Sequence, residues 1–369
     1  MTKHINPFKI LALAALIVLP ALSRAAGNED GSEKLKTISK SYTVGPNDKL
    51  KIENSFGDVI INTWDKNEFK VDIEMYAKAA SDERAQYMLD HIKVTDSKTG
   101  NVVQFKTDIH INGNNSHDND DNDDGDDDDD KDNKNHHKHH NGNNQQFHVN
   151  YVVYMPATNP LYLENSFGKT TVPDFKGLAN ITSKFGSLTT GNLDNAENID
   201  VQFGKAEIGN VKNGKVNFQY DDHVKVADIS GNAKVVVGFS GNTQIGVGNN
   251  IEDLSINESY SSIRLIVPKD LSASFNIHTN FGDFHNSTDF AIHEDKDDDN
   301  GGPKFDKDFA GTVGSGKAKI KIKSSFGDVR LSHSGISKDE EEKERAEKKE
   351  RKERKEKKER KETKESEES

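Results

Sequence analysis

Short stretches of alternating apolar and polar residues recur along the middle of the chain, and each follows an aromatic residue that is usually paired with glycine. The stretch NSFGKTTV at residues 165–172 shows the pattern, and NSFGDVII at residues 54–61 is an earlier copy. With the aromatic residue as the marker, the later copies lie at Phe167, Phe185, Phe203, Tyr220, Phe239, Tyr260, Phe281 and Phe326. Successive markers are 18, 18, 17, 19, 21, 21 and 45 residues apart. This regular spacing is typical of a repeat architecture.

The length of one copy predicts a coil of parallel strands. About 18 to 21 residues hold two or three short strands with tight turns, so the chain can coil once and pair with itself at about 4.8 Å per rung. In this interpretation the aromatic side chain points inward and stacks on the next rung, while the glycine adopts the corner angles. We predict an all-β fold with a parallel right-handed β-solenoid, or β-helix, over residues 160–332. Turns of an antiparallel sandwich are the alternative interpretation.

Residues 39–156 do not keep this period and predict a separate β-rich subdomain with one helix. Residues 50–52 and 59–61 form a hairpin around the first Phe-Gly pair in this interpretation, and residues 69–75 alternate as a third strand. Ser81 can cap a helix whose apolar stripe consists of Ala85, Met88, Leu89 and Ile92. Strands near residue 93, at 102–111 and at 147–155 complete the subdomain, which we expect to cap the open end of the solenoid.

The first residues indicate export. Residues 1–25 have a basic start, an apolar run too short for a confident membrane span, and small residues before position 26, as in a secretory signal peptide. No other segment of the 369-residue chain is long and apolar enough to span a membrane, so we expect no membrane span in the mature chain. The chain has no cysteine, which excludes disulfides. These features predict a protein of the periplasm, the cell surface or the medium.

A low-complexity insertion, predicted to be disordered, occupies residues 112–146 and would project from a hairpin tip. Part of it matches the first half of a calcium loop, but Lys131 stands at the twelfth position, where a glutamate belongs. Its histidines could bind zinc, nickel or copper. The candidate metal ligands are Asp120, Asn122, Asp124, His136, His137, His139 and His140. A solvated loop without a specific ligand is the alternative, and no cofactor is expected beyond a loosely bound divalent cation.

Few residues of the solenoid suggest catalysis. Asp58, Asp283 and Asp328 each follow a Phe-Gly pair, which suggests either a row of carboxylates or ordinary corner residues. Asp221 and Asp222 are adjacent, so on a strand they point to opposite faces and form a poor acid and base pair. The histidines of this region accompany no nucleophile motif: His223, His278, His285 and His293. Residues 293–303 form an acidic surface loop, and the corner at Phe326 is expected to close the last rung.

The end of the chain, residues 337–369, is a tail of nearly balanced Glu, Lys and Arg residues. Glutamates four residues before a cation favour an isolated charged helix, and the lack of apolar heptad positions excludes a coiled coil. Because these charges cancel and the whole chain has a net charge of −13, we expect no nucleic-acid partner.

The sequence resembles the bacterial putative adhesin family with β-strand repeats, a family of unknown molecular function. The resemblance rests on LKIENSFGDVIINTWDKNEFKVDI at residues 50–73, YVVYMP at 151–156 and LYLENSFGKTTV at 161–172, together with the leader and the single helix. Together with the export signal, the repeats and the lack of a catalytic constellation, it favours an exported, non-enzymatic binding module of the cell envelope or cell surface, a putative adhesin, whose partner is a surface glycan, a protein or an envelope component. Divalent-metal capture through the Asp/His insertion and an envelope-stress role in the periplasm are the alternatives. A polysaccharide-active enzyme ranks below them.

Overall fold

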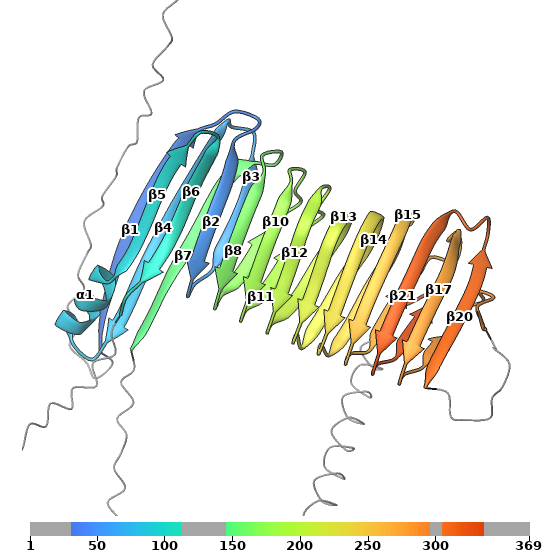
Figure 1. The fold of residues 1–369 in the computed structure, drawn as a ribbon. Helices are drawn as coiled ribbons and strands as arrows, with labels where there is room; N and C mark the ends of the chain where they lie inside the picture. Colours follow the sequence, from blue (N-terminus) through green and yellow to red (C-terminus); the bar gives the residue numbers. More distant parts are fainter. Residues whose placement is uncertain (1–30, 112–144, 296–304, 336–369) are drawn as a thin grey trace, which may run out of the picture.

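The computed structural model describes residues 31–111, 145–295 and 305–335, and this part of the chain contains 22 strands and one helix. The strands form a long, open stack of rungs (Figure 1). Each rung consists of two strands that meet at one of the aromatic markers, so the stack has a first row and a second row of strands. A rung is named below by its aromatic residue.

In each rung the first-row strand leads up to the aromatic residue and the second-row strand follows it, whereas the two strands that extend the rows beyond the Phe56 rung meet at no aromatic marker. In spatial order the first row is β6 (Val102–Ile109), β2 (Lys49–Ser55), β8 (Leu161–Ser166), β10 (Ala179–Lys184), β12 (Ala196–Gln202), the C-terminal parts of β13 (Lys205–Gln219), β14 (His223–Gly238) and β15 (Asn242–Ser259), then β21 (Ala318–Ser325) and β17 (Ala273–Asn280). The second row is β7 (Gln146–Pro156), β3 (Val59–Trp64), β9 (Lys169–Val172), β11 (Ser187–Thr190), the N-terminal parts of β13 to β15, then β16 (Ile263–Ile266), β22 (Val329–Ser332) and β18 (Phe284–Asn286). All neighbours within these two rows are parallel, as the period predicts.

The core consists of aliphatic side chains that repeat in register from rung to rung. One such column in the first row is Ile52, Leu163, Ile181, Ile199, Val216, Val235, Ile256, Ile322 and Ile277. Every member of this column is at most 3% exposed. Because strand residues alternate between the two faces, the polar residues between them form the outer face of the row. The handedness of the coil stays a prediction.

The order of the last rungs differs from their order in the sequence. From β15 the chain passes through β16 to β17, and it later returns through β21, which lies between β15 and β17 and is parallel to both (Figure 1). The expectation that the Phe326 corner closes the last rung is therefore wrong, because the Phe281 rung lies beyond it. Strand β20 (Asp306–Val313) pairs antiparallel with β17 at this end, and β19 (His293–Glu294) pairs with β20.

At the other end, the stack continues into antiparallel strands. Strand β1 (Ser32–Thr43) pairs with β4 (Glu68–Ala79), β4 with β7, and β5 (Ile92–Thr99) with β6. The third predicted strand is β4, and the predicted helix is α1 (Asp82–Asp90), whose first turn donates from Arg84 N–H to the Ser81 hydroxyl. Ala85, Met88 and Leu89 are buried, as the helical spacing predicts, whereas Ile92, the fourth residue of the predicted stripe, is buried as the first residue of β5.

Two predictions for this end are wrong. The stretch around the first Phe-Gly pair is not a hairpin, because β2 pairs in parallel with β6 and β8 while β3 pairs in parallel with β7 and β9. This stretch is the Phe56 rung of the stack. The strands on either side of the Asp/His insertion, β6 and β7, belong to different rows and do not form the expected hairpin.

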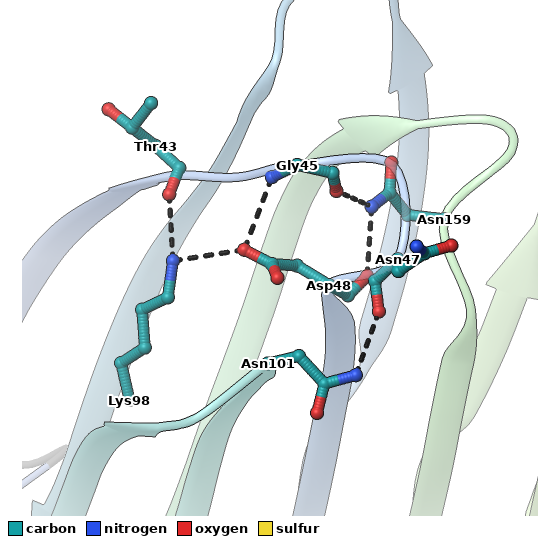
Figure 2. Close-up of polar contacts among 7 residues, drawn as sticks. All are labelled: Thr43, Gly45, Asn47, Asp48, Lys98, Asn101 and Asn159. Atoms are coloured by element: carbon teal, nitrogen blue, oxygen red, sulfur yellow. Dashed lines mark hydrogen bonds and ion pairs between the residues drawn. The ribbon is translucent and has the colours of Figure 1, made fainter.

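A cluster of polar contacts joins three connections where the antiparallel strands meet the stack (Figure 2). The Lys98 ammonium donates to the Thr43 carbonyl at 2.9 Å and pairs with the Asp48 carboxylate at 3.0 Å. Asn159 donates to the carbonyls of Gly45 and Asp48, both at 2.8 Å. The contacts satisfy backbone groups of the turn between β1 and β2, so we assign them a structural role.

Several predictions concern residues that the structure does not describe: the signal peptide, residues 112–144 of the insertion, residues 296–303 of the acidic loop, and the charged tail. Within the described ranges, no helix has the length and apolar character needed to cross a membrane.

Candidate binding surface

Aromatic rings from consecutive rungs stack into one continuous ladder along the corner between the two rows. Neighbouring ring centroids lie 4.6 to 5.0 Å apart in the order Phe56, Phe167, Phe185, Phe203, Tyr220, Phe239, Tyr260, Phe326 and Phe281. Neighbouring planes are within 8° of parallel. The ring separation equals the strand spacing of a sheet, because each ring occupies the same position in its rung.

The ladder faces solvent, and the expectation that these rings point inward is wrong. The nine side chains are 38 to 54% exposed. Each aromatic residue has a positive φ, between 51° and 62°, so the aromatic residue rather than the glycine adopts the left-handed corner conformation. This backbone turn directs the ring outward, and stacking on the neighbouring rings offsets the strain of about 1 to 2 kcal/mol per residue.

The glycines are needed for a different reason than the predicted backbone angles. A β-carbon on Gly186 would lie 1.9 Å from the carbonyl oxygen of Gly168, and one on Gly204 would lie 2.1 Å from that of Gly186. Neither glycine has a positive φ. At these corners the backbones of successive rungs are too close for any side chain.

Three neighbouring corners have a buried polar residue in place of this glycine: Asp221, Ser240 and Ser261. Gly204 N–H donates to Asp221 Oδ1 at 2.8 Å, Asp221 N–H to Ser240 Oγ at 3.2 Å, and Ser240 N–H to Ser261 Oγ at 2.9 Å. Ser261 N–H donates to Glu258 Oε1 at 2.7 Å. A chain of side-chain acceptors thus joins these rungs and ends in a carboxyl group on both sides.

Burial raises the pKa of both carboxyl groups. The pKa of Asp221 rises to about 6 and that of Glu258 to about 7, with burial as the main cause in each case. Glu258 also accepts a hydrogen bond from the Ser324 hydroxyl of the inserted strand β21. Asp221 is buried and Asp222 is exposed, and both lie between β13 and β14 rather than on a strand.

The outer face of the first row presents polar side chains in register. Asp200 accepts from Asn217 at 2.6 Å and from Gln202 at 2.8 Å, and Gln219 donates to Asn217 at 3.2 Å. Farther along the face lie Ser255, Asn257, Asn276 and His278. Amide and hydroxyl groups can both donate and accept, so this face can form hydrogen bonds with a polyhydroxylated partner.

Apart from Lys49, which lies over the Tyr162 ring, the lysines on this outer face fall into two groups. Near β2 and β10 they pair with carboxylates of the same face: Lys106 with Asp108, Lys51 with Glu53, and Lys184 with Glu164. On β13, β14 and β21 five exposed lysines form no ion pair with any residue in the described ranges: Lys215, Lys234, Lys319, Lys321 and Lys323. The alternation KAKIKIK at residues 317–323 is the sequence signal for three of them, but it predicts only a strand unless the neighbouring strands are known.

The aspartates after Phe-Gly pairs form corners rather than one row. Asp58 accepts from Lys169 N–H at 2.8 Å, and Asp328 accepts from Asp283 N–H at 3.1 Å. Asp58 lies in the Phe56 rung, at the opposite end of the stack from Asp283 and Asp328. The Asp58 and Asp328 carboxylates bind the backbone of the adjacent rung, which supports the conformational interpretation of these two residues.

Asp283, Asp328 and His285 have potential metal-ligand atoms within 4.8 Å of one another. The Lys307 ammonium contacts Asp283 and lowers the pKa of that carboxyl, so a cation already neutralises this aspartate. His278 instead contacts Asp308 at 2.9 Å, and His293 lies in β19. The seven candidate ligands of the Asp/His insertion, residues 120 to 140, lie outside the described residues.

No protein-family model matches the sequence, and no curated protein matches it. Among solved structures, the chain is similar to a putative adhesin from Bacteroides fragilis, with 12% identity, a TM-score of 0.32, and coverage of 80% of this chain and 97% of that one. It is also similar to a putative cell adhesion protein from Clostridium sporogenes, with 10% identity, a TM-score of 0.19, and coverage of 81% and 99%. Because both TM-scores are below 0.5, neither structure supports a conclusion about this chain.

Proposed function

We propose that the chain is a non-enzymatic binding module of the cell envelope or cell surface, and that the outer face of the first strand row is its contact surface. One observation supports this assignment above the others. The face continues over successive rungs with amide, hydroxyl and charged groups at matching strand positions, interrupted at β14 by Val236, and the aromatic ladder borders it along one side. A rigid array of this kind suits an extended partner that makes many equivalent contacts.

We assign no catalytic role to the titratable groups that the fold brings together, because the contacts of these groups are structural. Glu258 and Asp221 are buried and bind the backbone, whereas Asp283 pairs with Lys307. The Ser324 hydroxyl that Glu258 contacts is fully buried and also lies 2.8 Å from the Gly327 carbonyl oxygen, so no substrate can reach it.

Binding of the purified full-length protein to intact bacterial cells and to isolated envelopes tests the proposal. A variant with Asn257→Tyr and Asn276→Tyr places bulk on the proposed face. Its matched control, Thr171→Tyr with Thr189→Tyr, places the same bulk on the outer face of the second row. Tyrosine is well tolerated at outward strand positions, so both variants should fold.

We expect the face variant to bind at least about fivefold more weakly, and the control to bind as the parent does. Absence of binding by the parent protein, or equal binding by all three proteins, would contradict the proposed surface. Protease accessibility of the protein on intact and permeabilised cells separates a surface location from a periplasmic one.

A further inference from the structure

The five unpaired lysines of the outer face form one patch on adjacent strands. Lys215 and Lys234 are direct partners in the register of β13 and β14, and Ser255 of β15 lies between Lys234 and Lys321. Lys319, Lys321 and Lys323 occupy alternate positions of β21, roughly 7 Å apart along the strand. The patch exists only because β21 returns to lie beside β15.

Leaving these cations unpaired is unfavourable for the fold itself. Like charges directly opposite each other in a sheet are destabilising, as for Lys215 and Lys234. On the same face, the lysines near the Phe56 and Phe167 rungs have carboxylate partners, apart from Lys49, which lies over the Tyr162 ring. The contrast within one surface indicates that solubility alone does not explain the patch.

The spacing of the patch favours a partner with repeated negative charges. Lys215 and Lys234 are one strand spacing apart, about 4.8 Å, and successive lysines of β21 are roughly 7 Å apart. Both separations are within about one Debye length, roughly 8 Å at physiological salt, so the potentials of these charges add at the surface. Asn217, Ser255 and Asn257 lie among the lysines on the same face, together with one carboxylate, Asp253, the register partner of Lys319. Amide and hydroxyl groups placed between cations match a chain that carries hydroxyl groups as well as anions.

We propose that this patch binds an acidic polysaccharide, a chain of sugar units that carry carboxylate or sulfate groups. The inference rests on the proposed function and identifies the partner of that same face. Lysine recognises such anions as a flexible point charge, which suits a polymer with several spacings of charge. A nucleic acid would share the negative charge, but the exposed aromatic rings cover one another's faces and so offer no stacking platform for bases.

The experiment uses the full-length protein with four probes: heparin, polygalacturonate, neutral dextran and a DNA duplex. The patch variant carries Lys319→Gln, Lys321→Gln and Lys323→Gln. The matched control carries Lys51→Gln, Lys106→Gln and Lys184→Gln, which removes three positive charges from the same face but from its paired region. All six residues point outward on strands, so both variants keep the core intact.

We expect the parent protein to bind heparin and polygalacturonate but not dextran. The patch variant should lose at least about tenfold in affinity, and the slope of log affinity against log salt should fall by about two to three. The control should change affinity less than about twofold. An equal loss of affinity in both variants would show that net charge alone explains the binding and would contradict a specific patch. Binding to DNA as tight as, or tighter than, binding to the acidic polysaccharides would overturn the choice of partner.

The outcome is separable from that of the proposed function. A protein that binds cells through the outer face, but whose cell binding is unchanged in the patch variant, would overturn the polysaccharide inference alone. A protein that binds none of the probes and no cells would overturn both.

Discussion

Two kinds of corner solve the same geometric problem in different parts of the stack. At six corners a glycine follows the aromatic residue, and the backbones of successive rungs approach so closely that a β-carbon would clash. At the Tyr220, Phe239 and Tyr260 corners, buried polar side chains lie between the rungs and accept hydrogen bonds from the next backbone. The aromatic ladder passes through both kinds without a break.

The difference shows that the aromatic position and the glycine position have separate roles. The ladder needs a ring in the left-handed conformation at every rung, and all nine rungs have one. The residue after the ring needs either no side chain or one that satisfies buried N–H groups. Polar corners thereby introduce groups that titrate, whereas glycine corners contain none.

The largest expected effect is at a glycine corner. Gly186→Ala would place a β-carbon 1.9 Å from the Gly168 carbonyl oxygen. Backbone on both sides prevents relief, so we expect a loss of more than about 3 kcal/mol in the free energy of unfolding. Denaturant unfolding followed by circular dichroism measures it. The control is Gly45→Ala, since nothing lies within 4 Å of a β-carbon at Gly45, and equal losses in the two variants would contradict this account.

The second effect concerns the pH dependence of the polar corners. Burial raises the pKa of Glu258 to about 7 from its ordinary value of 4.5, so the folded protein holds this proton more tightly than the unfolded chain does. The stabilisation that the folded protein gains by holding this proton is therefore fully present below pH 4.5. It is lost as the pH rises from 4.5 to about 7, and it stays lost at higher pH. The loss amounts to at most about 3 kcal/mol.

Glu258→Gln replaces the carboxyl with a neutral group of similar shape. We expect the variant to be more stable than the parent at pH 8, by at most about 3 kcal/mol in the free energy of unfolding. Its stability should also change less than that of the parent between pH 5 and pH 7. Urea titrations at several pH values measure both. Asp221→Asn should act in the same direction at lower pH, because the pKa of Asp221 is raised only to about 6. Identical profiles for parent and Glu258→Gln would contradict the raised pKa.

The third effect tests the ladder. Phe203 is stacked on both sides and has a φ of 56°. Phe203→Ala removes the stacking but keeps the strain, and we expect a loss of about 2 to 3 kcal/mol. Phe203→Gly also removes the strain, so it should be about 1 kcal/mol less destabilising than alanine.

At an exposed strand residue without a positive φ, the glycine variant should be less stable than the alanine variant, the reverse of the order at Phe203. Ile60 is exposed on β3 and has no positive φ, so glycine there should be worse than alanine. Thermal unfolding of the four variants measures both orders. The same order at both positions would show that the left-handed conformation is not what distinguishes the ladder.

Much of the stack could be predicted from the sequence because its period and its alternation are local signals. The strands around Phe167 to Tyr260, the third strand β4 and the helix after Ser81 follow from such signals. The direction of the rings could not be predicted in this way. A Phe-Gly pair suggests that glycine supplies the left-handed residue, whereas here the aromatic residue supplies it and glycine permits close packing.

The lysine patch could not be predicted because it depends on the order of rungs. Identical corner motifs at Phe281 and Phe326 do not reveal which rung lies beside Tyr260, and the gap of 45 residues between them shows only that something intervenes. Strand β21 pairs with β15, so lysines about a hundred residues apart in sequence meet on one face. The candidate metal ligands of the Asp/His insertion stay predictions.

The smallest effect isolates a single link of the polar corners. The Ser240 hydroxyl accepts from Asp221 N–H at 3.2 Å and donates to the Gly238 carbonyl at 3.0 Å. Ser240→Ala leaves both buried backbone groups without this partner, and we expect a loss of about 1 to 2 kcal/mol. Ser255→Ala on the outer face is the control and should change stability by less than about 0.5 kcal/mol. If denaturant unfolding gives the two variants the same stability, the polar corners are held by backbone pairing alone, and the serine has no role that glycine lacks.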